Sequence, residues 1–328
     1  MKKTLLFLCI CGMAVAVMAG VLSPYNLGRV TVRVVDEQGN PVTNATAGIG
    51  FSRNIPAGEG WGTRPFSITG QTDTNGMFSA EAEGNPSGSC SARKEGYYPT
   101  LGIDFMFTNV VGDRWEPWNP TIAVVLRKVG NPIPMYAKRV PIESEMPVAD
   151  EPVGYDLMIG DWVAPHGKGQ VADFVVTMKR RVADWKDFET HLTLTFSNQL
   201  DGIQAIQEAG PKGSAFRLPR TASETSYQVM WTNSIGYVPG KGYFQTQPKN
   251  CLGYLFRARS VVDDKGQLVR ALYGKIKGPI EFDARESKTA HIGFTYYLNP
   301  TPNDRNLEFD PSRNLLTDLK SAEQVKEP

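Results

Sequence analysis

The chain has 328 residues, 41% of them hydrophobic, and carries 35 Lys and Arg against 34 Asp and Glu. This length favours two domains with a core in each, and the apolar content excludes a disordered or collagen-like chain. A formal net charge of +1 provides neither a basic excess for nucleic acid nor an acidic excess for cations. We therefore expect a globular protein that does not bind nucleic acid.

Residues 1–19 have the pattern of a secretory signal peptide: two lysines, a short apolar run, and small residues around Ala19. The apolar run is shorter than the ~20 residues that a spanning helix needs, and no second run of that kind follows. Cys9 and Cys11 lie in the run without a small residue before them, which argues against a lipoprotein signal. The sequence thus predicts an exported periplasmic or extracellular protein, without a transmembrane segment in the mature chain.

After such cleavage the remaining cysteines are Cys90 and Cys251, in different halves of the chain. In an oxidising compartment they could form a disulfide that joins the two halves. The alternative is two separate thiols that behave as small hydrophobic side chains, and the general burial of free cysteine favours it. Neither residue belongs to a zinc-binding or C-x-x-C spacing.

The first half reads as β-strands and turns. Residues 29–35 alternate apolar and polar side chains, as in a half-buried strand, and residues 36–41 form a strand-breaking cluster. Asn75-Gly76 is a tight-hairpin signal, because both positions tolerate positive φ angles. Residues 121–126 are a continuous apolar run and predict a buried strand.

These turns resemble those of the carboxypeptidase regulatory-like, or transthyretin-like, domain. The segments are Val-Asp-Glu-Gln-Gly-Asn-Pro-Val (35–42), Thr-Asp-Thr-Asn-Gly-Met-Phe (72–78) and Lys-Glu-Gly-Tyr-Tyr-Pro (94–99). The resemblance covers residues 28–130 and implies a seven-stranded, Ig-like β-sandwich that serves as an accessory module without catalytic residues. Residues 51–67 depart from the family as a long Gly/Pro-rich insertion.

The second half predicts another β domain. Residues 131–153 are rich in proline and predict an extended linker. Residues 154–312 contain many short strand patterns between turns, as in a second antiparallel sandwich or jelly roll. Residues 313–328 are expected to form a polar tail, and only residues 181–187 and the tail after Asn314 have helix-like patches. The expected fold class is therefore all-β, with two domains.

Catalytic and metal-binding motifs do not emerge from the sequence, so we predict no cofactor, no metal and no catalytic residue. The three histidines lack metal-ligand spacing, and no serine lies in a G-x-S-x-G elbow. His166 differs from the other two because its Pro/Gly-rich turn could expose it to a ligand. The alternative function is a secreted carbohydrate-active or peptide-cleaving hydrolase, which would need two converging carboxylates. The candidates for that role are the acidic residues at 281, 283, 304, 308 and 310.

Loop tryptophans give the strongest functional lead. Trp61 lies in a glycine-rich loop, and Trp115 and Trp118 lie close together in another. A large, rigid apolar ring can bind a sugar or a peptide at low entropic cost, although such rings also fold back over small cores. We predict an exported, non-enzymatic binding or envelope-associated protein, with a glycan, a peptide or a cell-envelope component as its partner. Its candidate binding residues are Trp61, Trp115, Trp118 and His166.

Overall fold

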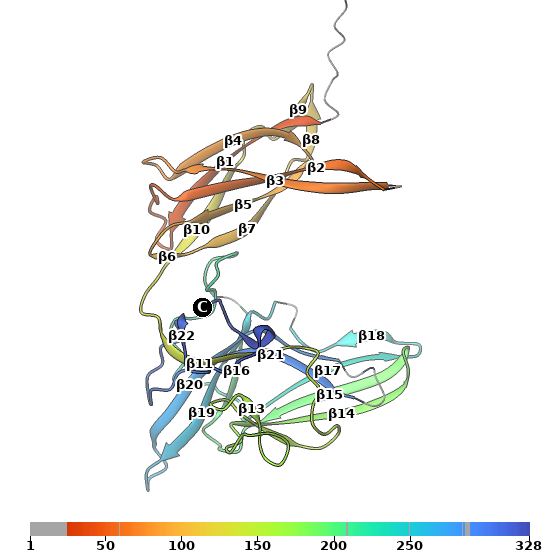
Figure 1. The fold of residues 1–328 in the computed structure, drawn as a ribbon, viewed down its shortest axis with the longest axis vertical. Helices are drawn as coiled ribbons and strands as arrows, with labels where there is room; N and C mark the ends of the chain where they lie inside the picture. Colours follow the sequence, from red (N-terminus) through yellow and green to blue (C-terminus); the bar gives the residue numbers. More distant parts are fainter. Residues whose placement is uncertain (1–24, 59, 208, 249, 284, 286–288) are drawn as a thin grey trace, which may run out of the picture.

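The computed structural model describes residues 25–328 except 59, 208, 249, 284 and 286–288, so the predicted signal peptide lies outside the described residues. The described chain forms two β lobes in succession (Figure 1). In the described ranges the only helical element is the 3₁₀ turn η1, Ser321–Glu323. The predicted all-β class is confirmed.

The N-terminal lobe consists of two sheets that face each other across one apolar core. Its strands are β1 (Asn26–Asp36), β2 (Thr46–Ala57), β3 (Gly60–Gln71), β4 (Met77–Gly84), β5 (Ser87–Arg93), β6 (Tyr97–Tyr98), β7 (Thr100–Met106), β8 (Asn109–Val111), β9 (Arg114–Glu116) and β10 (Thr121–Lys128). One sheet has the order β6-β10-β1-β9-β8, with β4 also pairing with β1, and the other has the order β3-β2-β5-β7. Two sheets sharing a core make this lobe a sandwich.

The alternation of apolar and polar residues along β1 places its valines in this core, as the sequence predicted. Val30, Val32 and Val34 are fully buried and belong to the same cluster as Ile49 of β2 and Cys90 of β5. Successive side chains of a strand point to opposite faces, so every second residue of β1 faces the other sheet. The pattern of the sequence therefore fixes which face of the strand is buried.

The predicted turns form with the aspartates as their anchors. The Asp36 carboxylate accepts the backbone N–H of Gln38 and Asn40, and Asp73 accepts those of Asn75 and Met77. Gly76 has φ +73°, and a Cβ there would lie 2.4 Å from the carbonyl oxygen of Val34. Backbone conformation and space thus both require glycine in this turn.

The β2–β3 hairpin extends beyond its sheet. Residues 46–57 of β2 pair with β3, whereas only residues 46–50 also pair with β5. The outer part is a two-stranded arm that projects from the lobe on the right of Figure 1. The Gly/Pro-rich insertion noted in the sequence supplies most of this arm, which we call the β2–β3 arm (residues 51–66).

The C-terminal lobe is a second pair of sheets around a larger core. Its strands are β11 (Ile133–Val140), β12 (Val153–Asp156), β13 (Asp161–Trp162), β14 (Phe174–Asp184), β15 (Asp187–Thr195), β16 (Gly202–Ile206), β17 (Met230–Val238), β18 (Gly242–Gln245), β19 (Gly253–Val262), β20 (Leu268–Asp283), β21 (His291–Leu298) and β22 (Phe309–Asn314). The sheet orders are β16-β19-β20-β21-β11-β22 and β13-β12-β14-β15-β17-β18. One cluster joins both sheets, with Phe174, Leu192, Tyr254 and Tyr296 among its fully buried members.

The expected linker over residues 131–153 is wrong in its first part, which is a strand of the C-terminal lobe. Residues 133–140 form β11, which pairs with β21 and β22 inside the C-terminal sheet. Pro134 is tolerated because the register of β11 against β22 shifts between Ile133 and Met135. Met146, further along, is buried in the large core. The second lobe therefore begins near residue 133 instead of 154.

The C-terminal segment is also more ordered than the expected polar tail over residues 313–328. Val325 is buried against Met135 and Tyr297, and Glu323 forms an ion pair with Lys138 at 3.0 Å. The Tyr297 hydroxyl donates to the Glu327 carbonyl at 3.1 Å. One apolar residue and several polar contacts hold this segment on the sheet, and the predicted helix-like patch reduces to η1.

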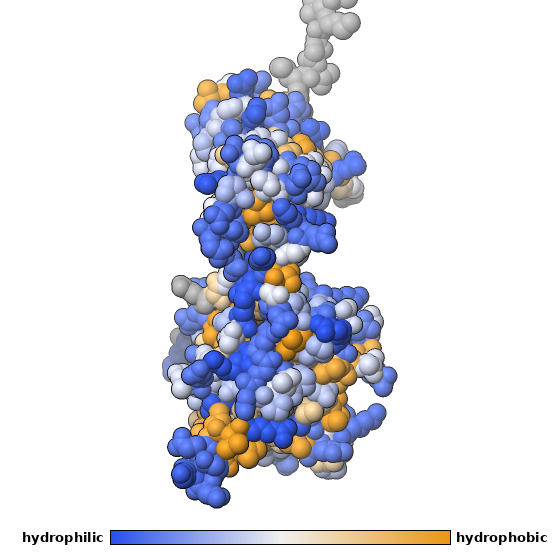
Figure 2. Space-filling model, turned by 90° about the vertical axis from the view of Figure 1, so that its left-hand side faces the viewer, coloured by the Kyte–Doolittle hydropathy of each residue, from blue (hydrophilic) through white to orange (hydrophobic). Residues whose placement is uncertain are grey.

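Charged and aromatic residues hold the two lobes together. Arg127 of β10 donates to the carbonyl oxygens of Phe216 and Leu218 at 2.9 and 2.7 Å, and pairs with Glu37 at 3.0 Å. Figure 2 shows the junction as a waist at which hydrophilic and hydrophobic residues lie side by side. The backbone N–H groups of Leu101 and Ala215 also cross this junction, each at 2.9 Å from a carbonyl of the opposite lobe.

Glu308 is the acidic centre of the junction. Its carboxylate is buried and accepts the Tyr98 hydroxyl at 3.1 Å and the backbone N–H groups of Gly130 and Asn131 at 3.0 and 2.7 Å. Arg220 forms an ion pair with the same carboxylate. These contacts link the N-terminal lobe, the connecting residues and the last strand region in one polar cluster.

Candidate functional site

Trp61 lies at the end of the β2–β3 arm with 77% of its surface exposed. It pairs across the hairpin with Pro56, close to the turn that joins the two strands. A ring of this size left in solvent at a hairpin end makes no contribution to a core. The arm therefore presents the ring to whatever approaches it.

The opposite face of the arm carries a basic and aromatic surface. Arg53, Ile55, Arg64 and Phe66 line a shallow hollow of 340 Å³. The Arg53 guanidinium lies 5.3 Å from the centroid of the Phe66 ring. Because side chains alternate across a strand, this hollow and the Trp61 ring occupy opposite faces of the arm.

Trp115 and Trp118 have different surroundings. Trp115 stacks on Phe107 with an interplanar angle of 7°, and its indole N–H donates to the carbonyl oxygen of Gly84 at 2.8 Å. The guanidinium of Arg114 lies 4.9 Å from the Trp118 ring centroid. The structure thus uses Trp115 in packing the end of the lobe, and it leaves Trp61 as the open ring of the three.

A second exposed tryptophan escaped the sequence analysis. Trp185 is 72% exposed in the turn between β14 and β15, and the Lys186 ammonium lies 4.3 Å from its ring centroid. The expected helical patch over residues 181–187 is wrong, since these residues form the end of a hairpin with Asp184 opposite Asp187. Cross-strand pairing with β15 outweighs a weak helical preference here. The sequence did indicate this exposure, because Trp185 stands alone between charged residues.

The two tryptophan-bearing hairpins point the same way. In Figure 1 the β2–β3 arm and the ends of β14–β15 and β17–β18 all project on one side of the molecule. Tyr243 on β18 pairs with Tyr237 and is 57% exposed, which adds another exposed ring to the same sheet. We call these projecting ends, with Trp61 in one lobe and Trp185 in the other, the aromatic arms.

His166 lies in an exposed loop of the C-terminal lobe. Its backbone N–H donates to the Val163 carbonyl, and Asp161 fixes the loop by accepting the Lys168 N–H at 2.8 Å. Asp156 accepts two more amides of this loop; burial opposes its ionisation, but these bonds and Arg259 leave its pKa lowered. The four residues predicted as a binding set are therefore divided between the two lobes.

The two cysteines are free thiols at different depths. Cys90 is buried in the N-terminal core, and burial raises its pKa to about 12. Cys251 is half-buried at the junction of the lobes.

The acidic residues expected as hydrolase candidates have separate partners. Asp283 pairs with Arg285 at 3.0 Å, and Asp310 with Arg313 at 2.6 Å. Asp304 accepts the side-chain amide of Asn299 at 3.0 Å, and Glu308 lies in the junction cluster. Glu281 lines a groove beside the C-terminal segment. These carboxylates therefore lie in different surroundings.

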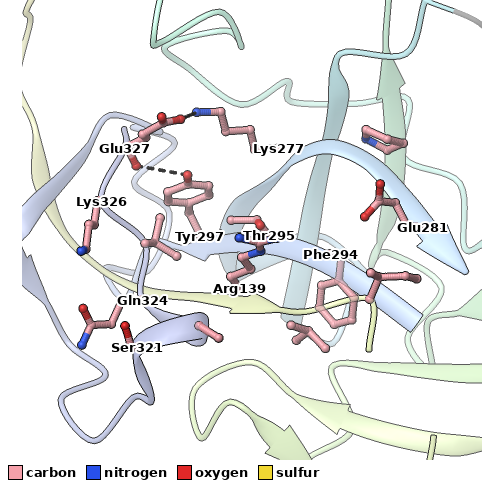
Figure 3. Close-up of a pocket in the computed structure, with 15 residues that line it drawn as sticks. Arg139, Lys277, Glu281, Phe294, Thr295, Tyr297, Ser321, Gln324, Lys326 and Glu327 are labelled. Carbon is pink, nitrogen blue, oxygen red and sulfur yellow. Dashed lines mark hydrogen bonds and ion pairs between the residues drawn. The ribbon is translucent and has the colours of Figure 1, made fainter. Parts of the chain in front are cut away.

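That groove lies between the C-terminal segment and the sheet, with a volume of 570 Å³ (Figure 3). Arg139 and Thr295 lie between Tyr297 and Phe294, while Glu281 stands at the far end from Glu327. Lys277 pairs with Glu327 at 2.5 Å at the upper edge. The groove is a mixed polar surface whose rings are buried beneath it.

Neither a metal-binding group nor a membrane-spanning helix is found among the described residues. Outside the omitted positions, no group of three or more His, Cys, Asp or Glu side chains could hold a metal ion. None of the described residues form a helix with the length and hydropathy of a membrane span.

Comparison with known proteins leaves the family open. No family model and no curated protein matches the chain. One similar solved structure, at 2.00 Å resolution, is a protein from Bacteroides uniformis ATCC 8492 provisionally described as carbohydrate binding. It is 10% identical, covers 83% of this chain and 98% of its own, and superposes with a TM-score of 0.19. A TM-score this low carries no argument about fold or ligand.

Proposed function

We propose that this is an exported, non-enzymatic protein that binds an envelope glycan through its aromatic arms. The observation that carries the proposal is the exposure of Trp61 and Trp185, at 77% and 72%, on hairpin ends that project on the same side. Tryptophan supplies a wide, rigid apolar face that can stack on a sugar ring at little cost in conformational entropy. The export pattern of residues 1–19 supports a partner outside the cytoplasm.

Each arm also carries hydrogen-bonding groups. Arg53 and Arg64 lie on the face of the β2–β3 arm opposite Trp61, and Lys186 contacts the ring of Trp185. Such donors suit hydroxyl and carboxylate oxygens of an acidic or neutral glycan. The separate partners of the late carboxylates support binding over the alternative of hydrolysis. The turn motifs of residues 35–42, 72–78 and 94–99 support an accessory-module role for the N-terminal lobe.

The test is a glycan array probed with the mature chain and with Trp61→Ala, Trp185→Ala and the double variant. Val261→Ala is the matched control, because Val261 is also an exposed apolar residue of a strand. We expect each single variant to bind about three- to tenfold more weakly, and the double variant to lose more than either. Unchanged binding by the double variant, or no glycan retained by the parent protein, would contradict the proposal.

A further inference from the structure

A further cavity lies where the two lobes meet, away from the aromatic arms. Its volume is 440 Å³, and most of its wall is apolar. The apolar lining comes from both lobes: Pro99, Leu101, Ala215, Phe216, Leu218 and Leu252. Cavities of about 300–1,000 Å³ between domains are frequent positions for small ligands.

The wall of this cavity is held in place before any ligand arrives. Leu101 donates its backbone N–H to Gly213, and Ala215 donates to Pro99, so both lobes are joined at the cavity itself. Arg127 donates to the carbonyl oxygens of Phe216 and Leu218, on either side of Arg217, and so fixes this part of the wall. A preformed cavity avoids most of the ordering cost of binding.

Positive charge surrounds the central ring of the wall. The Phe216 centroid lies 4.5 Å from the Arg127 guanidinium, 4.3 Å from the Lys275 ammonium and 6.0 Å from Arg220. Arg217 and Lys277 line the cavity directly. The acidic groups of the same region are Glu37, Glu308 and Glu327. Among the side chains, five basic groups thus stand against three acidic ones, and this excess of basic side chains favours an anionic ligand.

Lys275 is an unusual member of this group. It is 1% exposed, its ammonium lies between the rings of Phe216 and Tyr297, and its nitrogen has no hydrogen-bond partner among the described residues. Burial, with Lys277 and Arg127 nearby, lowers its pKa well below the usual range. Even with Lys275 neutral, four basic side chains remain against three acidic ones.

The edge of the cavity already binds a carboxylate. Lys277 donates to the Ala215 carbonyl and pairs with Glu327 of the C-terminal segment, whose side chain is 68% exposed. Glu327 and Pro328 lie at the cavity, so this carboxylate occupies the place where the head of a ligand would meet Lys277. We propose that the cavity binds a small amphipathic carboxylate, with its apolar body against Phe216 and Leu252 and its carboxylate on Lys277 in place of Glu327.

Dodecanoate at concentrations below micelle formation is the probe, and calorimetry on the mature full chain is the first measurement. We expect one molecule of dodecanoate per chain and about tenfold weaker binding of the uncharged dodecanol. Lys277→Met should weaken dodecanoate binding about tenfold, whereas the matched variant Lys265→Met, in an exposed turn, should not. Glu327→Gln should bind several-fold more tightly, because it removes the competing carboxylate.

Cys251 gives an independent readout because it lines the cavity, while Cys90 lies in the N-terminal core. Bound dodecanoate should slow alkylation of Cys251, and Ala215→Trp, which fills the cavity without changing its charge, should abolish both binding and protection. Far-ultraviolet circular dichroism of each variant separates loss of binding from loss of folding. Absent binding in the parent and in Glu327→Gln, equal affinity for dodecanol, or unprotected Cys251 would each overturn the proposal.

Discussion

The core of the N-terminal lobe and the junction between the lobes are stabilised by different chemistry. Val32, Leu126 and Ile49 represent the N-terminal core, where buried side chains are apolar and no partner has to be charged. At the junction, by contrast, Glu308 and Arg127 are buried together with ionic partners. Apolar contacts tolerate small shifts, but a buried charge is costly unless its partner is in place. The junction should therefore be the more brittle of the two regions.

The strongest test of this comparison is Glu308→Ala. The change leaves Arg220, the Tyr98 hydroxyl and two backbone N–H groups without their shared acceptor, so we expect a loss of about 3–5 kcal/mol in the free energy of unfolding. Urea unfolding measures it. Glu224→Ala is the control: Glu224 also pairs with an arginine, Arg305, but is 74% exposed and should cost less than about 1 kcal/mol. Equal losses in the two variants would remove the distinction.

Lys275→Met tests the junction through pH. Because burial lowers the pKa of Lys275 in the folded protein, the unfolded state binds more protons between that pKa and its ordinary value of 10.5. Stability should therefore rise with pH across this interval, by up to about 1.4 kcal/mol per pH unit. Lys275→Met should remove that part of the slope, and the exposed control Lys265→Met should keep it.

The measurement is the free energy of unfolding from urea titrations between about pH 8 and about pH 10, where the slope is expected. Lys275→Met should gain most over the parent at the lower pH, since a methionine carries no charge to desolvate. A variant slope equal to the parent's would mean that Lys275 is not the group that couples folding to proton binding.

The smallest effect is expected at the arm. Trp61→Ala removes an exposed ring and should change stability by less than about 0.5 kcal/mol. Trp115→Ala, a matched change in the same lobe, removes the stack on Phe107 and the bond to Gly84, and should cost about 2 kcal/mol. Thermal unfolding monitored by near-ultraviolet circular dichroism compares the two. A large loss for Trp61→Ala would show that its ring supports the fold and is not held free for binding.

Local patterns predicted the strands well. The alternation over residues 29–35 lies inside β1, and the apolar run over residues 121–126 lies inside β10. In both, the signal for a strand lies in consecutive residues, so no distant information is needed. The prolines of residues 131–153 led to a wrong prediction of a linker because the deciding contact is distant. The strand β11 accepts Pro134 because of its register against β22, a partner far along the chain.

The junction and the open rings could not be predicted in this way. Glu308 bonds to Gly130 and Asn131 across more than 170 residues, and nothing near Glu308 in the sequence distinguishes it from a surface acid. The sequence places Trp61 and Trp115 in loops, whereas they lie in β3 and β9. Only the contact of Trp115 with Phe107 separates a packing ring from an open one. Composition names the candidates, but tertiary contacts decide among them.

The bonds that Arg127 makes to two main-chain carbonyls, together with the Glu308 cluster, have a mechanical consequence for the aromatic arms. Because the lobes are joined in this way, they hold Trp61 and Trp185 at a fixed separation. A polymer whose repeat matches that gap would engage the second ring at a high effective concentration after the first, whereas one of another repeat would engage a single ring. Selectivity would then come from the spacing of the ligand's units as much as from their chemistry.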